Sequence, residues 1–483
     1  MKNQIPLFLL LFFCSSLFSQ VQLGTDILGA DFSDYAGWSV AISDDGNRVA
    51  VGAIRNSDNG IFHSGHVRVL EWTNNEWTQV GEAISGLNER DFAGGIIALS
   101  NDGNRVAVAD INAGTPLSND GRVRIFEWRD NSWKQMGPDI LGVREDEIMG
   151  SDISFSQDGN KVAIGAHGHN NKGTFTGRIR VYQWNSANWV PIGGDIDGEQ
   201  AWDLFGYDLR LSADGNHLIA MSPGYTEFGP DDTYIKVFEL VASNNWRQLG
   251  ETFNLPGIFE RTFVNISRDG QRICFNHPKR FAQTEVLTYE WSNGTWVPAG
   301  DTIVSDSSTH VISTVSMSDD GQVLAVGVIN NEFGSPNRSY IQIYHWRNGN
   351  WQRQGENIEI GSSIPNLKLS TNGNRLIQGD YNYDSRRGRA IVYELDGIVS
   401  ITELPEMAEQ LLVFPNPTTE AIQLSRLLQN NEKLTLISTD GRVLRQWSAA
   451  HQQPFNIADL PPGIYHLLLE NGQQLWQQKI VKQ

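Results

Sequence analysis

The stretch GWSVAISDDGNRVAVGAI, residues 37–54, contains the pattern on which the interpretation of the fold rests. Two apolar segments flank a Ser-x-Asp-Gly turn, which predicts two antiparallel strands joined by a tight hairpin. The glycine supplies the positive φ that such turns require. The serine of the turn, called the marker serine below, recurs as SDDGN, SNDGN, SQDGN, SADGN, SRDGQ, SDDGQ and STNGN at Ser43, Ser100, Ser156, Ser212, Ser267, Ser318 and Ser370.

The seven copies define a repeat of constant length. Successive turn glycines are 51 to 57 residues apart. The first copy contains four strand-like segments, residues 37–43, 48–54, 66–72 and 76–81, which leaves no room for helices and excludes a helical solenoid. A period of this length filled with four strands is typical of a β-propeller blade, so the sequence predicts an all-β fold with a seven-bladed β-propeller.

The last repeat lacks a fourth strand, and the N-terminus supplies a candidate for it. VQLGTDILG, residues 21–29, resembles KQMGPDILG, residues 134–142, which is the fourth strand of the second repeat with its following loop. We therefore expect the N-terminal strand to complete the last blade and close the ring over residues 20–397.

Five tryptophan pairs, each five residues apart, flank the hairpins between the third and fourth strands. A two-residue turn between them places the two rings directly opposite each other, where an aromatic pair contributes about 0.2 to 1 kcal/mol. The pairs are interpreted as structural staples, with a sugar-stacking platform as the alternative: Trp72/Trp77, Trp128/Trp133, Trp184/Trp189, Trp291/Trp296 and Trp346/Trp351.

Composition narrows the class of partner. The chain of 483 residues has 37 Lys and Arg against 56 Asp and Glu, a net charge of −19, which disfavours nucleic acid. The two cysteines are Cys14 and Cys274, so no disulfide framework is expected, and Cys274 is predicted to be a buried thiol.

The N-terminus reads as a secretory signal peptide. Residues 1–19 place one lysine before a short apolar run and then small residues. The run is too short to span a membrane, and no other segment comes close. We expect cleavage near Ser19 or Gln20, and a secreted protein without a transmembrane segment.

The C-terminal segment, residues 411–483, has a different texture from the repeats. Its short alternating strands and Asn, Pro and Gly turns suit a small Ig-like β-sandwich, after a linker at residues 398–410. The segment resembles the type A C-terminal sorting domain of the type IX secretion system of Bacteroidetes, with a generic β module as the alternative. The motif residues are Phe414, Pro415, Asn416, Pro417, Gly441, Leu460, Pro461, Gly463, Tyr465 and Lys479. The resemblance implies export across the outer membrane, followed by release or surface attachment.

The repeats resemble the FG-GAP repeat in its bacterial extracellular form, over about residues 21–397. Phe205-Gly206 keeps the FG dipeptide, and VGA at 51–53 and IGA at 164–166 stand for the GAP half. Calcium-binding members of that family carry longer oxygen-rich loops, whereas these turns are too short to supply six to eight oxygens, so no cofactor is expected and calcium stays only an option. His167 and His169 form a His-x-His without an evident third ligand, so no metal site is predicted. The Ser-x-Asp-Gly turns differ from the Asp-box of sialidases, which has an additional residue between Asp and Gly and an aromatic residue soon after.

The candidate binding site is the face of the propeller that carries the long loops, because variable loops on a rigid scaffold often carry function. Its aromatic residues, mixed with carboxylates, suit a glycan or a protein ligand, with simple packing and solvation as the alternative. The candidate ligand-binding residues are Trp202, Tyr225, Phe228, Phe333, Tyr381 and Tyr383.

These features favour a secreted or cell-surface recognition or adhesion propeller, with the type IX secretion machinery and an extracellular glycan or protein as partners. No catalytic motif is evident, and no catalytic residue is assigned. An extracellular propeller enzyme, a glycan lyase or hydrolase acting on the long-loop face, is the alternative. A purely structural surface role is a third.

Overall fold

The computed structural model describes most of the chain between residues 20 and 482, and each part is treated by itself. The described residues are 20–114, 119–223, 225–226, 229–230, 233–242, 244–256, 262–277, 279, 283–330, 339–360, 366–395, 413–414, 418–424, 428, 432–438, 443–448, 451, 453–470 and 475–482. The expected signal peptide and linker lie outside them. Contacts divide the chain into two units, Met1–Asp396 and Gly397–Gln483.

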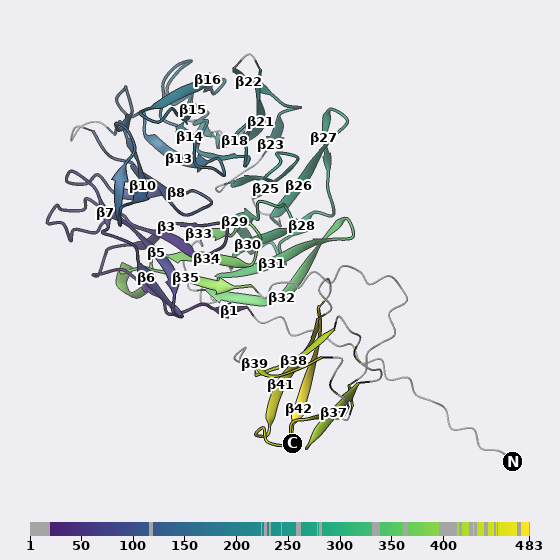
Figure 1. The fold of residues 1–483 in the computed structure, drawn as a ribbon. Helices are drawn as coiled ribbons and strands as arrows, with labels where there is room; N and C mark the ends of the chain where they lie inside the picture. The colour runs from purple at the N-terminus through teal and green to yellow at the C-terminus, as the bar shows by residue number, and fades with distance from the viewer. Residues whose placement is uncertain are drawn as a thin grey trace. The chain divides into compact units, whose positions relative to one another are not determined.

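Within the described part of the first unit, seven sheets share one plan: their main strands are antiparallel neighbours, and in six of them these strands follow chain order (Figure 1). Each sheet is named by its place along the chain, from sheet 1 to sheet 7. The first strands are β3 (Ala36–Ile42), β8 (Ala93–Leu99), β13 (Met149–Phe155), β17 (Asp208–Leu211), β24 (Val264–Ile266), β29 (His310–Met317) and β33 (Asn366–Leu369). The second strands are β4 (Arg48–Ala53), β9 (Arg105–Asp110), β14 (Lys161–Ala166), β18 (His217–Ser222), β25 (Arg272–His277), β30 (Val323–Asn330) and β34 (Arg375–Asp380).

The outer half of each sheet contains a second hairpin. The third strands are β5 (His66–Thr73), β10 (Arg122–Arg129), β15 (Arg178–Trp184), β21 (Thr233–Val241), β26 (Glu285–Ser292), β31 (Ser339–Arg347) and β35 (Arg389–Glu394). The fourth strands are β6 (Glu76–Gln79), β11 (Ser132–Gln135), β16 (Trp189–Asp197), β22 (Asn245–Gln248), β27 (Thr295–Pro298), β32 (Asn350–Ile360) and, in sheet 7, β1 (Val21–Gln22). Short additional strands also pair with the third strand: β2 (Ile27–Leu28), β7 (Ile84–Ser85), β12 (Ile140–Leu141), β23 (Phe253–Leu255) and β28 (Ile303–Val304).

Two small elements lie outside these sheets. The strands β19 (Tyr225–Thr226) and β20 (Gly229–Pro230) pair only with each other. The single turn α1 (Tyr383–Arg386) contains left-handed residues, with φ of 45° at Asp384 and 56° at Ser385.

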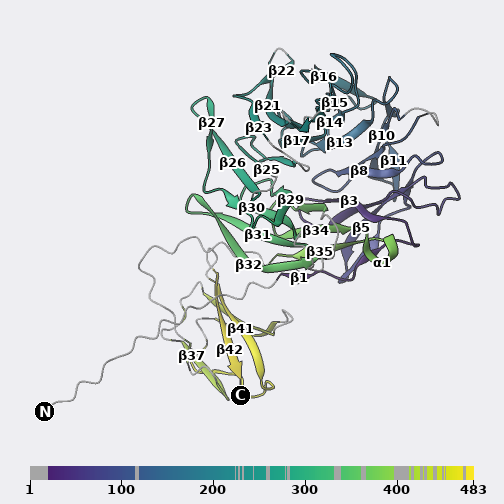
Figure 2. The same ribbon diagram turned by 180° about the vertical axis from the view of Figure 1, so that it is seen from behind.

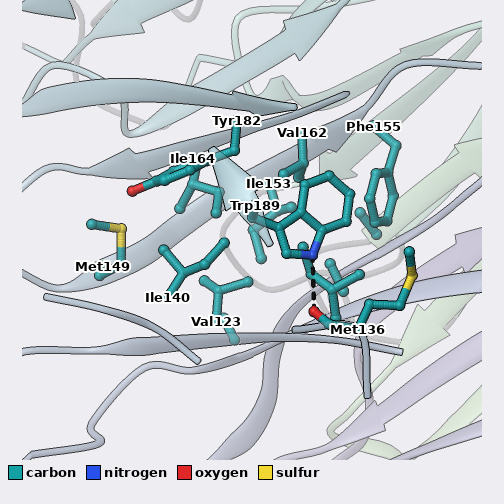
Figure 3. Packing of buried hydrophobic residues seen from close by; sticks show 14 of the residues in the cluster. Val123, Met136, Ile140, Met149, Ile153, Phe155, Val162, Ile164, Tyr182 and Trp189 are labelled. Atoms are coloured by element: carbon teal, nitrogen blue, oxygen red, sulfur yellow. Dashed lines mark hydrogen bonds between the residues drawn. The ribbon is translucent and has the colours of Figure 1, made fainter. Parts of the chain in front are cut away.

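The sheets are arranged in a cycle, with their first strands innermost (Figures 1 and 2). Each first strand contacts the next, from β3 through β8, β13, β17, β24, β29 and β33 and back to β3. A separate apolar core fills each space between neighbouring sheets. Figure 3 shows the core between sheets 2 and 3, where the indole of Trp189 donates to the carbonyl of Met136 at 3.1 Å. The unit is therefore all-β and propeller-like.

The N-terminal segment joins sheet 7. Val21 pairs with Glu394, and Ile27 pairs with Ala390. Ile27 is buried in the core between sheets 7 and 1. Asp26 forms an ion pair with Arg389 at 2.7 Å.

The tryptophan pairs lie opposite each other, as predicted. Strand register places Trp72 against Trp77 and Trp128 against Trp133, and the other three pairs follow the same rule. Their ring centroids are 5.0 to 5.3 Å apart. The second indole in four pairs also donates to a carbonyl of the neighbouring sheet, as Trp77 does to Leu23 at 2.9 Å. The pairs thus fasten one sheet to the next.

The second unit contains two described sheets. One joins β36 (Val413–Phe414), β37 (Ala421–Leu424) and β40 (Phe455–Asn456), and the other joins β39 (Val443–Ser448), β38 (Lys433–Ser438), β41 (Gly463–Glu470) and β42 (Leu475–Lys482). Leu434, Leu436, Leu467 and Ile480 are fully buried in its core. In the first unit, Cys274 is a buried free cysteine, as predicted.

We expect removal of β1 and β2 to destabilise the first unit strongly. A variant that begins at Asp31 loses the burial of Ile27, about 2 to 3 kcal/mol by itself, and exposes the edge of β35. Thermal unfolding should show a clearly lower Tm than a control chain that begins at Gln20. Equal Tm values for the two chains would contradict this role of the N-terminus.

Candidate functional site

The turn after each first strand is fixed by its marker serine. Ser100 Oγ donates to Asp102 Oδ1 at 2.6 Å and accepts the backbone N–H of Arg105 at 2.9 Å. The same two bonds recur at all seven turns, with Asn372 replacing the aspartate in the last. Because Asp102 also accepts the N–H of Asn104, its oxygens are occupied within the turn.

The acidity of these aspartates agrees with a structural role. Burial alone would raise the pKa of Asp102, but hydrogen bonds from Ser100 and Asn104 outweigh it and lower the pKa. Asp45, Asp158 and Asp214 show the same balance and the same lowered pKa. The turn carboxylates are therefore ionised groups that hold the hairpins.

The residue after each marker serine lies at the centre of the cycle. Backbone hydrogen bonds join several of these residues across neighbouring sheets: Asp44 N–H donates to Asn101 at 2.8 Å, and Arg268 N–H donates to Asp319 at 2.6 Å. Together with the residue two positions before each serine, they line one cavity of about 150 Å³, the axial cavity. The lining residues at these two positions are Ala41, Asp44, Ala98, Asn101, Ser154, Gln157, Arg210, Ala213, Asn265, Arg268, Ser316, Asp319, Lys368 and Thr371.

One end of the axial cavity is basic. Arg210 of β17 forms an ion pair with Asp152 of β13 at 2.7 Å, and its other terminal nitrogen lies 3.8 Å from Asp208. Burial, and then the charge of Arg210, lowers the pKa of Lys368 in β33 to about 8. Burial raises the pKa of Asp208 to about 6, although Arg210 opposes the shift.

The carboxylates behind Arg210 also join sheets. Asp152 accepts the N–H of Leu209 at 2.8 Å, and Asp208 accepts the N–H of Val264 at 3.0 Å. Each carboxylate accepts a backbone N–H from the first strand of the neighbouring sheet. The first strands of neighbouring sheets do not pair with each other, so these N–H groups need a side-chain acceptor.

The turn end of the axial cavity is acidic. Asp319 accepts a hydrogen bond from Asn101 at 3.1 Å. The single Thr371 hydroxyl hydrogen is shared between Asp44 and Asp319, whose carboxylate oxygen lies 3.3 Å from the hydroxyl. Burial raises the pKa of both carboxyl groups. The charge of Asp319 also raises the pKa of Asp44, and the charge of Asp320 raises that of Asp319. Arg268 lies 3.7 Å from Asp44, with 45% of its side chain exposed.

The axial cavity is absent from the sequence-based candidates. Its signal was present in the repeat: the turn residues are nearly constant, whereas the positions beside them vary from Ala to Arg, Lys and Asp. Such variation at a fixed structural position marks a surface that is free to differ. The sequence-based prediction places the binding site on the long loops and not in this cavity.

The long-loop residues that the structure describes do not form one platform. The ring of Trp202 lies 5.0 Å from that of Phe175, while Tyr381 stacks on Tyr35 and contacts Trp38 at a tilted angle. Tyr383 lies against Arg389, with 3.9 Å between the guanidinium and the ring centroid. Tyr225 lies in β19, and Phe228 and Phe333 lie outside the described residues.

Trp202 also occupies a repeated position. It has a φ of 69° and precedes Asp203, just as the left-handed residue Arg90 precedes Asp91. Asp203 accepts the N–H groups of Glu199 and Gln200, and Asp91 does the same for Leu87 and Asn88. These loop carboxylates therefore close turns.

Several of the exposed large apolar side chains lie on the loops that enter sheets 1 to 4. Antiparallel order places these loops, and the loop between β4 and β5, at the end of the sheets opposite the marker turns. Val143 is 70% exposed and Phe32 is 68% exposed. We call the set the loop arc: Phe32, Phe62, Leu87, Val143 and Trp202.

The two rings of the His-x-His pair contact different groups. His169 Nδ1 lies 2.9 Å from Glu147, whereas the ring of His167 lies 5.1 Å from that of Tyr207. Across the described ranges, no group of three or more His, Cys, Asp or Glu could hold a metal ion.

The sorting-motif residues fall partly within the second unit. The Tyr465 hydroxyl donates to the Pro461 carbonyl at 2.6 Å, which closes the turn before β41 and includes Gly463 at its start. Leu460 packs against the core of this unit. Phe414 lies in β36 and Lys479 in β42, while Pro415, Asn416, Pro417 and Gly441 lie outside the described residues.

Comparison with known proteins identifies the tail. Residues 412–483 match the family described as secretion system C-terminal sorting domain, which confirms the assignment made from the motif. The chain is therefore exported, to the cell surface or the surrounding medium, and carries the tail that type IX secretion machinery handles. None of the described helices is long and apolar enough to span a membrane.

Solved structures are similar to this chain only at low sequence identity. A chain of a mitotic checkpoint complex has a TM-score of 0.50 and 13% identity, with 82% of this chain and 95% of that chain covered. The periplasmic gluconolactonase of Pseudomonas aeruginosa has a TM-score of 0.43 and 14% identity, over 68% and 88% of the two chains. TolB from Acinetobacter baumannii has a TM-score of 0.36 and 14% identity, over 73% and 65%. No curated protein matches the sequence.

The buried carboxyl group of Asp208 predicts a specific pH dependence. Because its pKa is raised on folding, its contribution to the free energy of unfolding is present below about pH 4 and is lost as the pH rises through about 6. Asp208→Asn removes this loss and can still accept the N–H of Val264. Relative to the wild type, the variant should gain up to about 3 kcal/mol between pH 4 and pH 7 in urea unfolding.

Asp158→Asn is the matched control, because the pKa of Asp158 is lowered. Its difference from the wild type should not rise over this range. A pH-independent difference for Asp208→Asn would contradict the assignment.

Proposed function

We propose that this protein is an exported recognition or adhesion module, in which a seven-bladed, FG-GAP-like β-propeller binds an extracellular glycan or protein. In this proposal the N-terminal strand closes the last blade, and an Ig-like sandwich carries the sorting signal. The exported location supports an extracellular ligand.

The loop arc is the observation that carries the proposal. Its side chains are apolar and exposed, although they belong to loops whose own turns are closed by buried acceptors such as Asp91 and Asp203. Exposed apolar residues that gather on one set of loops are typical of interaction sites. The polar neighbours Arg90 and Arg144 supply hydrogen-bond donors around them.

The enzymatic alternative has less support on this face. A glycan hydrolase needs two carboxyl groups directed at the substrate. Glu147 and Asp203 are buried and accept backbone N–H groups or face His169. Their oxygens are committed to the loop structure.

Substitution within the loop arc should weaken ligand binding. The mature chain would first be screened against a glycan array and matrix proteins, with and without calcium. Phe62→Ala and Trp202→Ala should then reduce affinity for the ligand found by about 5- to 150-fold, which corresponds to one stacked aromatic at about 1 to 3 kcal/mol.

Val304→Ala is the matched control, because Val304 is also exposed but lies in sheet 5, outside the loop arc. It should leave affinity unchanged, and all three variants should keep the wild-type Tm within a few degrees. Equal affinities for Val304→Ala and both loop-arc variants would refute the proposed site.

A further inference from the structure

We propose that the axial cavity is a binding site for a small zwitterion, a molecule that carries a carboxylate and an ammonium group joined by a short chain. The site is separate from the loop arc, because it lies at the marker-turn end of the sheets. It adds a small-molecule ligand to the recognition role.

The basic end has hydrogen-bond donors without acceptors. In the part of the chain that the structure describes, neither a hydrogen bond nor an ion pair reaches Lys368 Nζ, although the residue is partly buried and lines the cavity. The carboxylates of Asp152 and Asp208 act on this ammonium only from beyond ion-pair distance, so an anionic group in direct contact with it would be stabilised. Arg210 commits one terminal nitrogen to Asp152, whereas its other terminal nitrogen lies 3.8 Å from Asp208 and makes no hydrogen bond within the described chain.

Two serines complete the anion-binding end. Ser154 Oγ accepts the N–H of Leu211 at 3.0 Å, and Ser316 Oγ accepts the N–H of Leu369 at 3.1 Å. Each hydroxyl therefore keeps its own hydrogen for donation to a ligand. With Arg210 and Lys368, the two serines make four donors, and each of the four comes from a different sheet. They therefore converge on the axial cavity and do not belong to one local turn.

The acidic end has the opposite deficiency. Asp44 and Asp319 share the hydroxyl of Thr371, and their nearest cation, Arg268, lies beyond hydrogen-bond distance and is partly in solvent. An ammonium placed between the two carboxylates would relieve their mutual repulsion. The cavity is thus complementary to both charges of a zwitterion.

The spacing of the two ends sets the length of the ligand. Lys368 lies in β33, and Thr371 lies three residues later in the turn that follows, so their backbone positions are at most about 10 Å apart. The long lysine side chain shortens the distance that a ligand must span. Ala41 and Ala98 occupy the level of Lys368 in sheets 1 and 2 and leave room for a chain of methylene groups.

Calorimetric titration of the mature chain tests the proposal with 6-aminohexanoate as the probe. Hexanoate and hexylamine, which carry only one of the two charges, serve as matched ligands. We expect 6-aminohexanoate to bind at least about tenfold more tightly than either, because each lost charged contact costs about 1.5 kcal/mol or more. No detectable binding of 6-aminohexanoate, or equal binding of hexanoate, would overturn the proposal.

Substitutions locate the bound probe. Lys368→Met and Asp319→Asn should each weaken 6-aminohexanoate binding at least about tenfold, whereas the exposed control Lys134→Met should not. Trp202→Ala should also leave it unchanged, which separates this site from the loop arc. If Lys368→Met fails to fold, Asp319→Asn and the comparison of the three ligands decide the question. Unchanged binding in Asp319→Asn would place the probe elsewhere and refute the site.

Discussion

The hydrogen bonds of the marker serine are the constraint on which the rest of the first unit depends. Each serine ends a first strand, fixes the turn through an aspartate or asparagine, and aligns the second strand through one backbone N–H. In five of the seven turns the residue five positions later is an arginine or lysine that donates to the next sheet. Arg48 donates to Gly103 and Asn104, and Arg375 of sheet 7 donates to Gly46 and Asn47 of sheet 1. One local motif thus connects neighbours and includes the contact that joins the last sheet to the first.

Radial packing completes what the turns begin. The glycine after several fourth strands has a positive φ and lies beneath an indole of the next sheet: a Cβ on Gly81 would stand 2.6 Å from Trp128. Only glycine fits there, which explains why a glycine recurs shortly after the fourth strand in these repeats. With both the centre and the periphery fixed in this way, the connecting loops can vary without loss of the scaffold, and the loop arc is a consequence of that freedom.

The sequence was sufficient for local features and insufficient for convergent ones. The marker turns and the opposed tryptophans follow from spacing within one repeat, because a tight turn dictates which residues face each other. The match between residues 21–29 and 134–142 led to the placement of the N-terminus, and the structure pairs β1 and β2 with β35. The axial cavity could not be found in this way, because Arg210 and Lys368 are far apart in the chain and meet only through the cyclic order of the sheets. The sequence predicts Trp202 to be a loop residue without a counterpart in the other repeats, yet its left-handed backbone recurs at Arg90.

The free energy of unfolding of Ser100→Ala tests the central claim most directly. Ser100 is fully buried, and its loss leaves the Arg105 N–H without an acceptor and removes one of the hydrogen bonds to the Asp102 carboxylate. Urea unfolding should show a loss of about 1 to 3 kcal/mol relative to the wild type. The exposed control Ser308→Ala should stay within about 0.5 kcal/mol. A Ser100→Ala chain as stable as Ser308→Ala would contradict the account.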